Sequence, residues 1–338
     1  MAQQKGREMR AEPTDSVGGR GASDMTNVLV TGAGGAAGVA VIRALGERGH
    51  RVIAVDSDPR AAGLRLAEER AVIGASTEPD RFVADLAAVV TRHDVDLVVC
   101  AASEETLVLA GREPEVGAAL WLPKRRSVVA CVDKWRFWKI AEHARIPAAP
   151  SALGDAAVDS ITESLAGPWI VKPRFGRGSL DVYRADDPAE LEWACGRIAQ
   201  PIVQTRARGR EFTLDLLVDR DGRIAAAVPR WRLETRGGIS TKGETFCDHR
   251  VNEVAERVVA AYSLTGAANL RGFVTVDDDV VVIEVNPRFS GGLSLSLAAG
   301  ADLVGEFVRG ALGHRLRPER LAFRPGVVVR DDMELFAA

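Results

Sequence analysis

The pattern of apolar and polar positions changes its period part-way along the chain. Apolar runs at 27–31, 52–56 and 96–100 are separated by segments of helical composition, which is typical of β-α-β units with a parallel sheet. Beyond residue 200 the apolar residues alternate with period two and turns join the runs. Antiparallel strands are therefore expected at 212–219, 224–228, 270–276 and 280–285. This pattern predicts an α/β layer over residues 26–125, followed by an α+β unit.

The last of these strands carries polar residues at a spacing that a core strand does not explain. Glu284, Asn286 and Arg288 recur at every second position, and period two places them on one face of a strand. Buried charges are usually paired or bound to metal. Carboxylate and carboxamide oxygens suit a magnesium ion that bridges phosphate oxygens, and an arginine suits a developing anion. This stretch is therefore the main candidate site.

A glycine-rich turn follows the first apolar run, at Gly32 to Gly38, and Asp56 ends the second run. This pattern is typical of dinucleotide binding, although a lone fingerprint is weak support. Glu105 follows the third run, and two interpretations of it stay open. It either orients a ligand amine at the carboxyl end of the sheet or caps a helix expected from Thr106.

Two lysines accompany features that favour anion binding. Lys134 begins a helix, where the macrodipole disfavours a cation, so a role in binding an anion and an ordinary surface position both stay open. Lys172 lies on an expected strand that leads into a turn with Gly176, Gly178 and Ser179. A strand lysine followed by a glycine-rich turn is how a lid places a cation and backbone amides on phosphates.

A basic segment surrounds Gly237-Gly238 and shows neither helical nor strand periodicity. Its residues are Arg230, Arg232, Arg236 and Lys242. A mobile basic loop and a clamp for an anionic substrate are about equally supported by this pattern.

Composition narrows the possible classes of partner. The net charge of -3 argues against nucleic acid and anionic membrane as partners. The four cysteines are scattered, which fits a reducing, cytoplasmic setting and neither a disulfide framework nor a zinc site. No apolar run approaches the length of a membrane span, and residues 1–25 are expected to form a disordered leader.

Four stretches, in this order along the chain, resemble the motifs of the ATP-grasp superfamily: residues 133–137, 171–179, 203–211 and 283–288. The resemblance is nearest to carbamoyl-phosphate synthase large subunits and biotin carboxylase, and it extends from residue 26 to the C-terminus. It implies a Rossmann-like preATP-grasp domain at 26–125 and an ATP-grasp fold at 126–325. The latter would have two α+β subdomains with a glycine-rich lid at about 151–203, and residues 326–338 would form a C-terminal strand or tail.

The same resemblance implies roles for individual residues. Lys134 and Lys172 would contact ATP phosphates, and the loop with Gly176, Gly178 and Ser179 would close over them. Gln204 would lie at the adenine and Glu211 at the ribose, while Glu284 and Asn286 would hold Mg²⁺ or Mn²⁺. Arg288 would steady the transferred phosphoryl group and the acyl phosphate. Apart from the resemblance, Glu105, Arg230, Arg232 and Ser290 are further expected substrate contacts, as is Arg288.

One position departs from the family pattern. The strand before Glu284 usually carries another metal ligand, and the matching residue here is Arg271. Three explanations stay open: magnesium is held by Glu284, Asn286 and water; Arg271 partly substitutes for a metal as a catalytic residue; or the site is weakened.

We expect an ATP-dependent ligase that joins a carboxylate to an amine through an acyl phosphate, with small-molecule substrates and a homodimeric assembly. Two other functions stay open. Either the glycine turn and Asp56 bind NAD(P) in an oxidoreductase or sensor, or the chain binds ATP as a partner protein with a disabled metal site.

Overall fold

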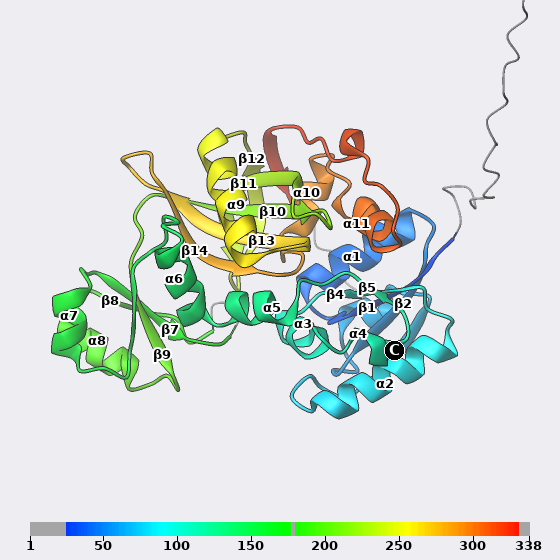
Figure 1. The fold of residues 1–338 in the computed structure, drawn as a ribbon, viewed down its shortest axis with the longest axis horizontal. Helices are drawn as coiled ribbons and strands as arrows, with labels where there is room; N and C mark the ends of the chain where they lie inside the picture. Colours follow the sequence, from blue (N-terminus) through cyan, green and yellow to red (C-terminus); the bar gives the residue numbers. More distant parts are fainter. Residues whose placement is uncertain (1–24, 177–179, 331–338) are drawn as a thin grey trace, which may run out of the picture.

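A computed structural model describes residues 25–176 and 180–330, and it contains three sheets (Figure 1). Among the described residues no helix is long and apolar enough to cross a membrane. The three sheets follow one another along the chain, and the polar residues of interest lie where they meet.

The first sheet has five parallel strands in the order β3-β2-β1-β4-β5. Helices cover both faces of this sheet, as is usual for parallel sheets. Its apolar central strand is therefore buried. Its strands are β1 (Asn27–Thr31), β2 (Arg51–Asp56), β3 (Glu69–Val72), β4 (Leu97–Cys100) and β5 (Ala119–Leu120). Its helices are α1 (Ala36–Glu47), α2 (Pro79–Arg92), α3 (Ser103–Leu109), α4 (Glu113–Val116) and α5 (Arg125–Val132), with a 3-10 turn at Ala62–Arg65.

The second sheet has four strands in the order β6-β9-β7-β8, and it forms a small layer of its own at the left of Figure 1. Two helices cover it, and Trp169, Leu191 and Val203 lie in the shared core. Helix α6 (Lys134–His143) leads into it. Its elements are β6 (Ser151–Leu153), α7 (Val158–Ser164), β7 (Trp169–Pro173), β8 (Tyr183–Ala185), α8 (Pro188–Cys195) and β9 (Pro201–Thr205).

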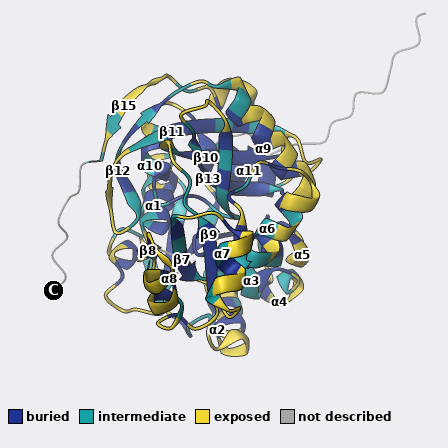
Figure 2. Ribbon diagram, turned by 90° about the vertical axis from the view of Figure 1, so that its left-hand side faces the viewer, coloured by how far each residue is buried: buried dark blue, intermediate teal, exposed yellow. Residues whose placement is uncertain are grey.

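The third sheet has six strands in the order β14-β13-β10-β11-β12-β15. Helices α6 and α9 pack on one face, and Figure 2 shows that the exposed residues of α9 lie on its outward side. The strands are β10 (Arg210–Val218), β11 (Ile224–Arg236), β12 (Ile239–Thr245), β13 (Gly266–Val274), β14 (Val280–Asn286) and β15 (Gly326–Val329). The helices are α9 (His249–Tyr262), α10 (Leu293–Ala298) and α11 (Leu303–Ala311), and a 3-10 turn spans Pro318–Arg320.

One apolar core joins the first and third sheets. Helix α1 packs against α10 and α11, and Leu45, Leu217 and Phe307 belong to the same buried cluster. An ion pair between Arg48 and Asp302 (2.5 Å) fastens this contact. The parallel sheet is thereby held against the antiparallel one, while the four-stranded sheet has a core of its own.

The expected fold class, α/β followed by α+β, is confirmed by these sheets. One local expectation is wrong: the basic segment is a β-hairpin of β11 and β12, with Gly237 and Gly238 at its turn. Both glycines have positive φ (55° and 74°), as the tight hairpin turn requires.

Candidate active site

A cavity of about 540 Å³ opens between the four-stranded and six-stranded sheets. Its walls come from both sheets and from the link 205–209 that joins them. The residues that the sequence singled out on this cavity are Lys134, Lys172, Gly176, Gln204, Glu211, Arg271 and Glu284. Seven predicted residues therefore converge on one space, although they are spread over 150 positions of sequence.

Lys172 supplies a buried cation on the lid side of the cavity. It lies on β7 and is 7% exposed, and its Nζ donates to Gln204 Oε1 at 2.9 Å. Gln204 in turn donates from Nε2 to Ser151 Oγ at 3.1 Å. The side chain of Gln204 therefore positions the lysine. The expected contact of Gln204 with adenine stays a prediction.

The environment lowers the proton affinity of Lys172. Burial is the main cause, and it lowers the pKa to about 8 against the opposing charge of Glu284. Lys134 and Arg271 lower it further because they are like charges. Phosphate binding would stabilise the charged form of this lysine, because the anion would supply an opposite charge beside it.

Lys134 lies at the start of α6, directly against the base of the glycine turn. Asp133 caps this helix and accepts two hydrogen bonds from the Arg174 guanidinium, at 2.8 and 2.6 Å. Lys134 Nζ donates to the carbonyl of Gly176 at 3.1 Å. Burial lowers the pKa of Lys134, while Glu284 opposes that shift. Lys134 is thus bonded to the lid base; Gly178 and Ser179 lie outside the described residues.

The acidic side of the cavity contains an unexpected arginine bridge. Arg271 Nε contacts Glu211 Oε1 at 2.5 Å, and its Nη1 lies 3.5 Å from Glu284 Oε1. Arg232 Nε lies 3.3 Å from the same Glu211 oxygen. Burial alone raises the pKa of Glu284, but the charges of Arg271, Lys172 and Lys134 outweigh it and hold that pKa below its usual value. Glu284 is therefore charged at neutral pH.

The side chains of Asn286 and Arg288 contact the start of helix α3, beside the first sheet, and do not line this cavity. Arg288 Nε donates to Ser103 Oγ at 3.0 Å, and its Nη1 donates to the carbonyl of Phe289 at 2.7 Å. Ser103 Oγ is also 3.5 Å from Asn286 Oδ1. Ser103, at the start of α3, was not singled out from the sequence. The only available signal was its place directly after the third parallel strand.

Glu105 supports the glycine-rich turn at Gly32 to Gly38. Thr31 Oγ1 donates to Glu105 Oε2 at 2.5 Å, and this oxygen lies under Gly32, where an added Cβ would approach it to 3.0 Å. The helix begins at Ser103, so the capping interpretation from Thr106 is wrong. The placement also argues against a ligand role for Glu105. Its neighbour Glu104 instead lines a second cavity.

Asp56 also serves the glycine turn. Its two carboxylate oxygens accept from the backbone amides of Gly34, at 2.7 Å, and Asp58, at 2.9 Å. A Cβ on Gly38 would lie 2.3 Å from the Gly32 carbonyl, so this glycine allows the helix to pack against the turn. These contacts explain the fingerprint by the local fold alone.

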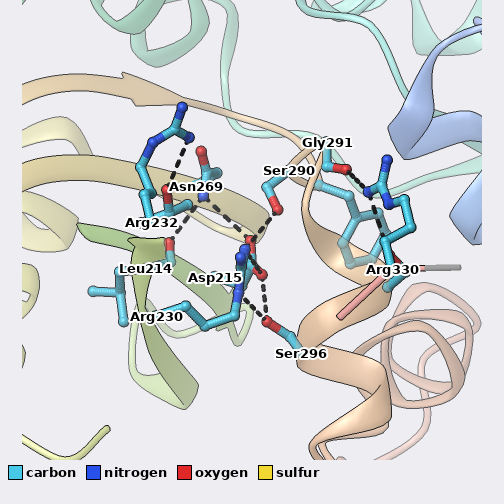
Figure 3. Close-up of polar contacts among 12 residues, drawn as sticks. Leu214, Asp215, Arg230, Arg232, Asn269, Ser290, Gly291, Ser296 and Arg330 are labelled. Atoms are coloured by element: carbon cyan, nitrogen blue, oxygen red, sulfur yellow. Dashed lines mark hydrogen bonds and ion pairs between the residues drawn. The ribbon is translucent and has the colours of Figure 1, made fainter. Parts of the chain in front are cut away.

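Arg230 is buried within the six-stranded sheet (Figure 3). Its Nη2 donates to Asp215 Oδ2 at 2.8 Å and to Ser290 Oγ at 3.2 Å. Its Nε donates to Ser296 Oγ at 2.8 Å. Arg230 is 0% exposed and Ser290 is 3% exposed. This burial argues against the substrate roles expected for both. The hydrogen bonds of Arg230 instead join β11 to Ser290 and to helix α10.

The oxygen donors present fit one magnesium ion and do not fit two. Glu284 and Asn286 are neighbours on one face of β14, and Mg²⁺ is commonly held by one or two carboxylates plus phosphate oxygens. Among the described residues, no group of three or more His, Cys, Asp and Glu side chains could hold a metal. The strand position opposite Glu284 is Arg271, a cation.

A second cavity of about 530 Å³ adjoins the first, and both are lined by Lys134, Gly176 and Glu284. The remaining walls come from the first sheet's domain, α5 and the lid base. Apolar side chains such as Leu107, Val108 and Phe175 line them. Polar and charged side chains lie among these, including Glu104, Arg112, Arg125 and Asn286. A small molecule here would lie next to the predicted phosphate and metal ligands.

The chain resembles known proteins in both sequence and structure. A family model described as "ATP-grasp in the biosynthetic pathway with Ter operon" matches residues 198–333. This match covers the six-stranded sheet and its helices, so that part of the chain is similar to ATP-grasp proteins. A second model, the NAD dependent epimerase/dehydratase family, matches residues 28–116 of the first sheet's domain.

The carbamoyl phosphate synthase large chain of Rubrobacter xylanophilus is 25% identical over 331 residues, covering 87% of this chain. The chain spans 31% of the length of that relative. Biotin carboxylase from Campylobacter jejuni has a TM-score of 0.71 at 19% identity, covering 89% of this chain and 74% of its own. The L-amino acid ligase from Bacillus licheniformis has a TM-score of 0.72 at 15% identity, covering 89% and 77%. The two solved structures confirm the ATP-grasp fold.

Proposed function

We propose that this ATP-grasp protein is an ATP-dependent ligase that joins a carboxylate to an amine through an acyl phosphate. The observation that carries the proposal is the convergence of Lys134, Lys172, Glu211 and Glu284 on one cavity between two sheets. ATP and Mg²⁺ are the cofactors. The same family model, together with the carboxylase and ligase neighbours, supports this assignment.

The lysines bind and orient the triphosphate. Lys172 is held by Gln204 and Lys134 by the lid base, so both cations are positioned before the nucleotide arrives. Fixed charges in a partly buried site stabilise transferring phosphoryl groups without reorganisation. A bound Mg²⁺, held by Glu284 and Asn286, would supply further positive charge to the phosphate oxygens.

The reaction balances without a covalent enzyme intermediate. A carboxylate oxygen of the substrate attacks the γ-phosphorus, the bond from that phosphorus to the β,γ-bridging oxygen breaks, and ADP leaves. The amine then attacks the acyl carbon, the C–N bond forms, and phosphate leaves with the electron pair of the C–O bond while the amine loses its proton. We assign Arg288 to the anionic oxygens, next to Asn286 and braced by Ser103.

The second cavity is the place that we assign to the carboxylate substrate. It adjoins Glu284 and Lys134, so a carboxylate at its inner end would lie near the terminal phosphate. Holding two reactants in this way converts a bimolecular step into an effectively unimolecular one. The structural similarity to the L-amino acid ligase supports an amino acid as one substrate. The apolar side chains of the second cavity suit an apolar substrate side chain.

Release of ADP tests the proposal. Purified protein with Mg-ATP is offered carboxylates and amines singly and in pairs, and ADP release is expected only with a carboxylate present. Lys172→Gln is expected to abolish this release, whereas Lys139→Gln, at an exposed lysine on α6, serves as the matched control and retains it. Equal rates in the two variants would contradict the assigned site.

A second candidate function rests on the epimerase-like match of residues 28–116. In it the first sheet's domain binds NAD(P), with or without hydride transfer. Both Asp56 oxygens already bind backbone amides, which speaks against a ribose contact. Titration with NADH and NADPH, followed by fluorescence, separates the two: micromolar binding would favour the dinucleotide function. The homodimer and the cytoplasmic location stay predictions.

A further inference from the structure

Arg271 lies between two acids of the cavity, Glu211 and Glu284. It lies on β13, and the register of the sheet places it directly opposite Glu284 on β14. The ATP-grasp pattern places a carboxylate or carboxamide at this strand position. Arg271 therefore puts a cation where the resemblance implies a metal ligand.

The contacts show that this arginine is built into the site. Its guanidinium binds Glu211 through Nε at 2.5 Å and faces Glu284 through Nη1 at 3.5 Å. Its side chain is 22% exposed, and the cavity that holds Lys172 is where it is accessible. An arginine in proteins keeps its charge, so the site carries a permanent cation here.

We propose that Arg271 is a fixed cation that replaces the second divalent metal, so that the chain binds nucleotide with a single metal ion. Its ligand is the diphosphate or triphosphate of the nucleotide. A guanidinium presents five donors in a planar fork that matches phosphate oxygens, and it loses less hydration than an ammonium. The inference rests on the proposed function, because it concerns how that site meets the nucleotide.

Two pairing partners keep the guanidinium in place. Glu211 and Glu284 approach it from β10 and β14, the two strands that flank β13. Arg232 supplies a further cation beside Glu211 at 3.3 Å, so Glu211 remains paired when Arg271 turns toward phosphate. Glu284 is then left for the single metal, together with Asn286.

Counting bound Mn²⁺ tests this inference without turnover. The full chain is saturated with the non-hydrolysable ATP analogue AMPPNP, and free Mn²⁺ is measured by electron paramagnetic resonance. We expect one Mn²⁺ per chain in the wild type and two in Arg271→Glu. The matched control is Arg210→Gln on the neighbouring strand β10, whose side chain pairs with Glu244, and it is expected to bind one.

Nucleotide affinity in EDTA gives a second readout that does not need the carboxylate variant to fold. ADP binding measured by calorimetry is expected to persist in the wild type and to weaken about tenfold or more in Arg271→Gln, the usual effect of losing a charged hydrogen bond. Arg210→Gln is expected to match the wild type.

The outcomes separate the two proposals. Two Mn²⁺ per wild-type chain, or equal metal-free ADP affinity in wild type and Arg271→Gln, would overturn the role of Arg271 and leave the ligase proposal standing. Nucleotide bound with no Mn²⁺ would overturn it as well and indicate a disabled metal site. Failure to bind any nucleotide, with or without metal, would overturn both.

Discussion

Replacing Lys172 by methionine is expected to stabilise the fold while abolishing ATP binding. The lysine is buried, and burial lowers its pKa from 10.5 to about 8. Folding therefore pulls a charged group out of water without an adequate counter-charge. Methionine has a similar length and carries no charge, so the variant removes that cost.

The magnitude follows from the pKa and from one hydrogen bond. Each tenfold change in acid strength corresponds to about 1.4 kcal/mol, so the lowered pKa corresponds to roughly 3 kcal/mol of lost stability. Against this, Gln204 Oε1 loses its donor, which costs about 1–3 kcal/mol in a buried site. The net expectation is a gain of up to about 2 kcal/mol at pH 7.

The pH dependence carries the sign of the argument. A lysine whose folded pKa lies below its unfolded pKa destabilises the protein fully below about pH 8, and this cost is relieved as pH rises toward 10.5. The advantage of Lys172→Met is therefore expected to be constant below about pH 8 and to shrink between pH 8 and pH 10. Urea unfolding of both proteins across this range measures it.

A matched control separates this effect from lysine loss in general. Lys139→Met, at a half-exposed lysine on α6, is expected to change stability little and without the same pH dependence. If Lys172→Met is destabilised by more than about 1 kcal/mol at pH 7, or if its difference from wild type does not change up to pH 10, the account of Lys172 is refuted.

Three further substitutions, the last with Gly46→Ala as its matched control, test other contacts of the fold. Asp215→Ala leaves the buried Arg230 guanidinium without its acid and is expected to cost about 3–5 kcal/mol in urea unfolding; a loss under 1 kcal/mol would contradict the pairing. Burial raises the pKa of Asp302, but hydrogen bonds outweigh burial and hold this pKa below its usual value. The stabilising effect of Asp302 is therefore present at neutral pH and lost as pH falls. Between pH 7 and pH 3 the free energy of unfolding should therefore fall less for Asp302→Asn than for the wild type. Equal falls in the two proteins would refute this. Gly38→Ala, whose Cβ would lie 2.3 Å from a backbone oxygen, is expected to lose about 1–3 kcal/mol in thermal unfolding. Gly46→Ala on the same helix has open space and should gain about 0.5–1 kcal/mol, so similar losses in both would contradict the close packing.

Much of the fold and of the candidate site could be predicted because the signals are local. The change from separated apolar runs to period-two alternation indicated the parallel and antiparallel sheets. Lys172 and Glu284 stood out as charges on otherwise apolar strands, and both line the same cavity.

The rest depends on partners far away in sequence. Arg230 belongs to a series of basic residues that resembled a loop, and only the pairing of β11 with β10 shows it buried against Asp215. Ser103 lies 185 positions from Arg288, so their contact has no local signal. The resemblance placed Gln204 at the adenine, yet its side chain faces Lys172 across two paired strands. Sequence spacing could not distinguish these alternatives.

The most direct test of the central claim follows an oxygen atom. A carboxylate substrate found to stimulate ADP release is labelled with ¹⁸O, and the phosphate released together with the coupled product is analysed by mass spectrometry. Transfer of one ¹⁸O from the carboxylate to phosphate is expected, because the acyl phosphate retains that oxygen when its C–O bond breaks. Unlabelled phosphate formed alongside ADP would mean that water attacks ATP directly, and it would contradict the ligase mechanism.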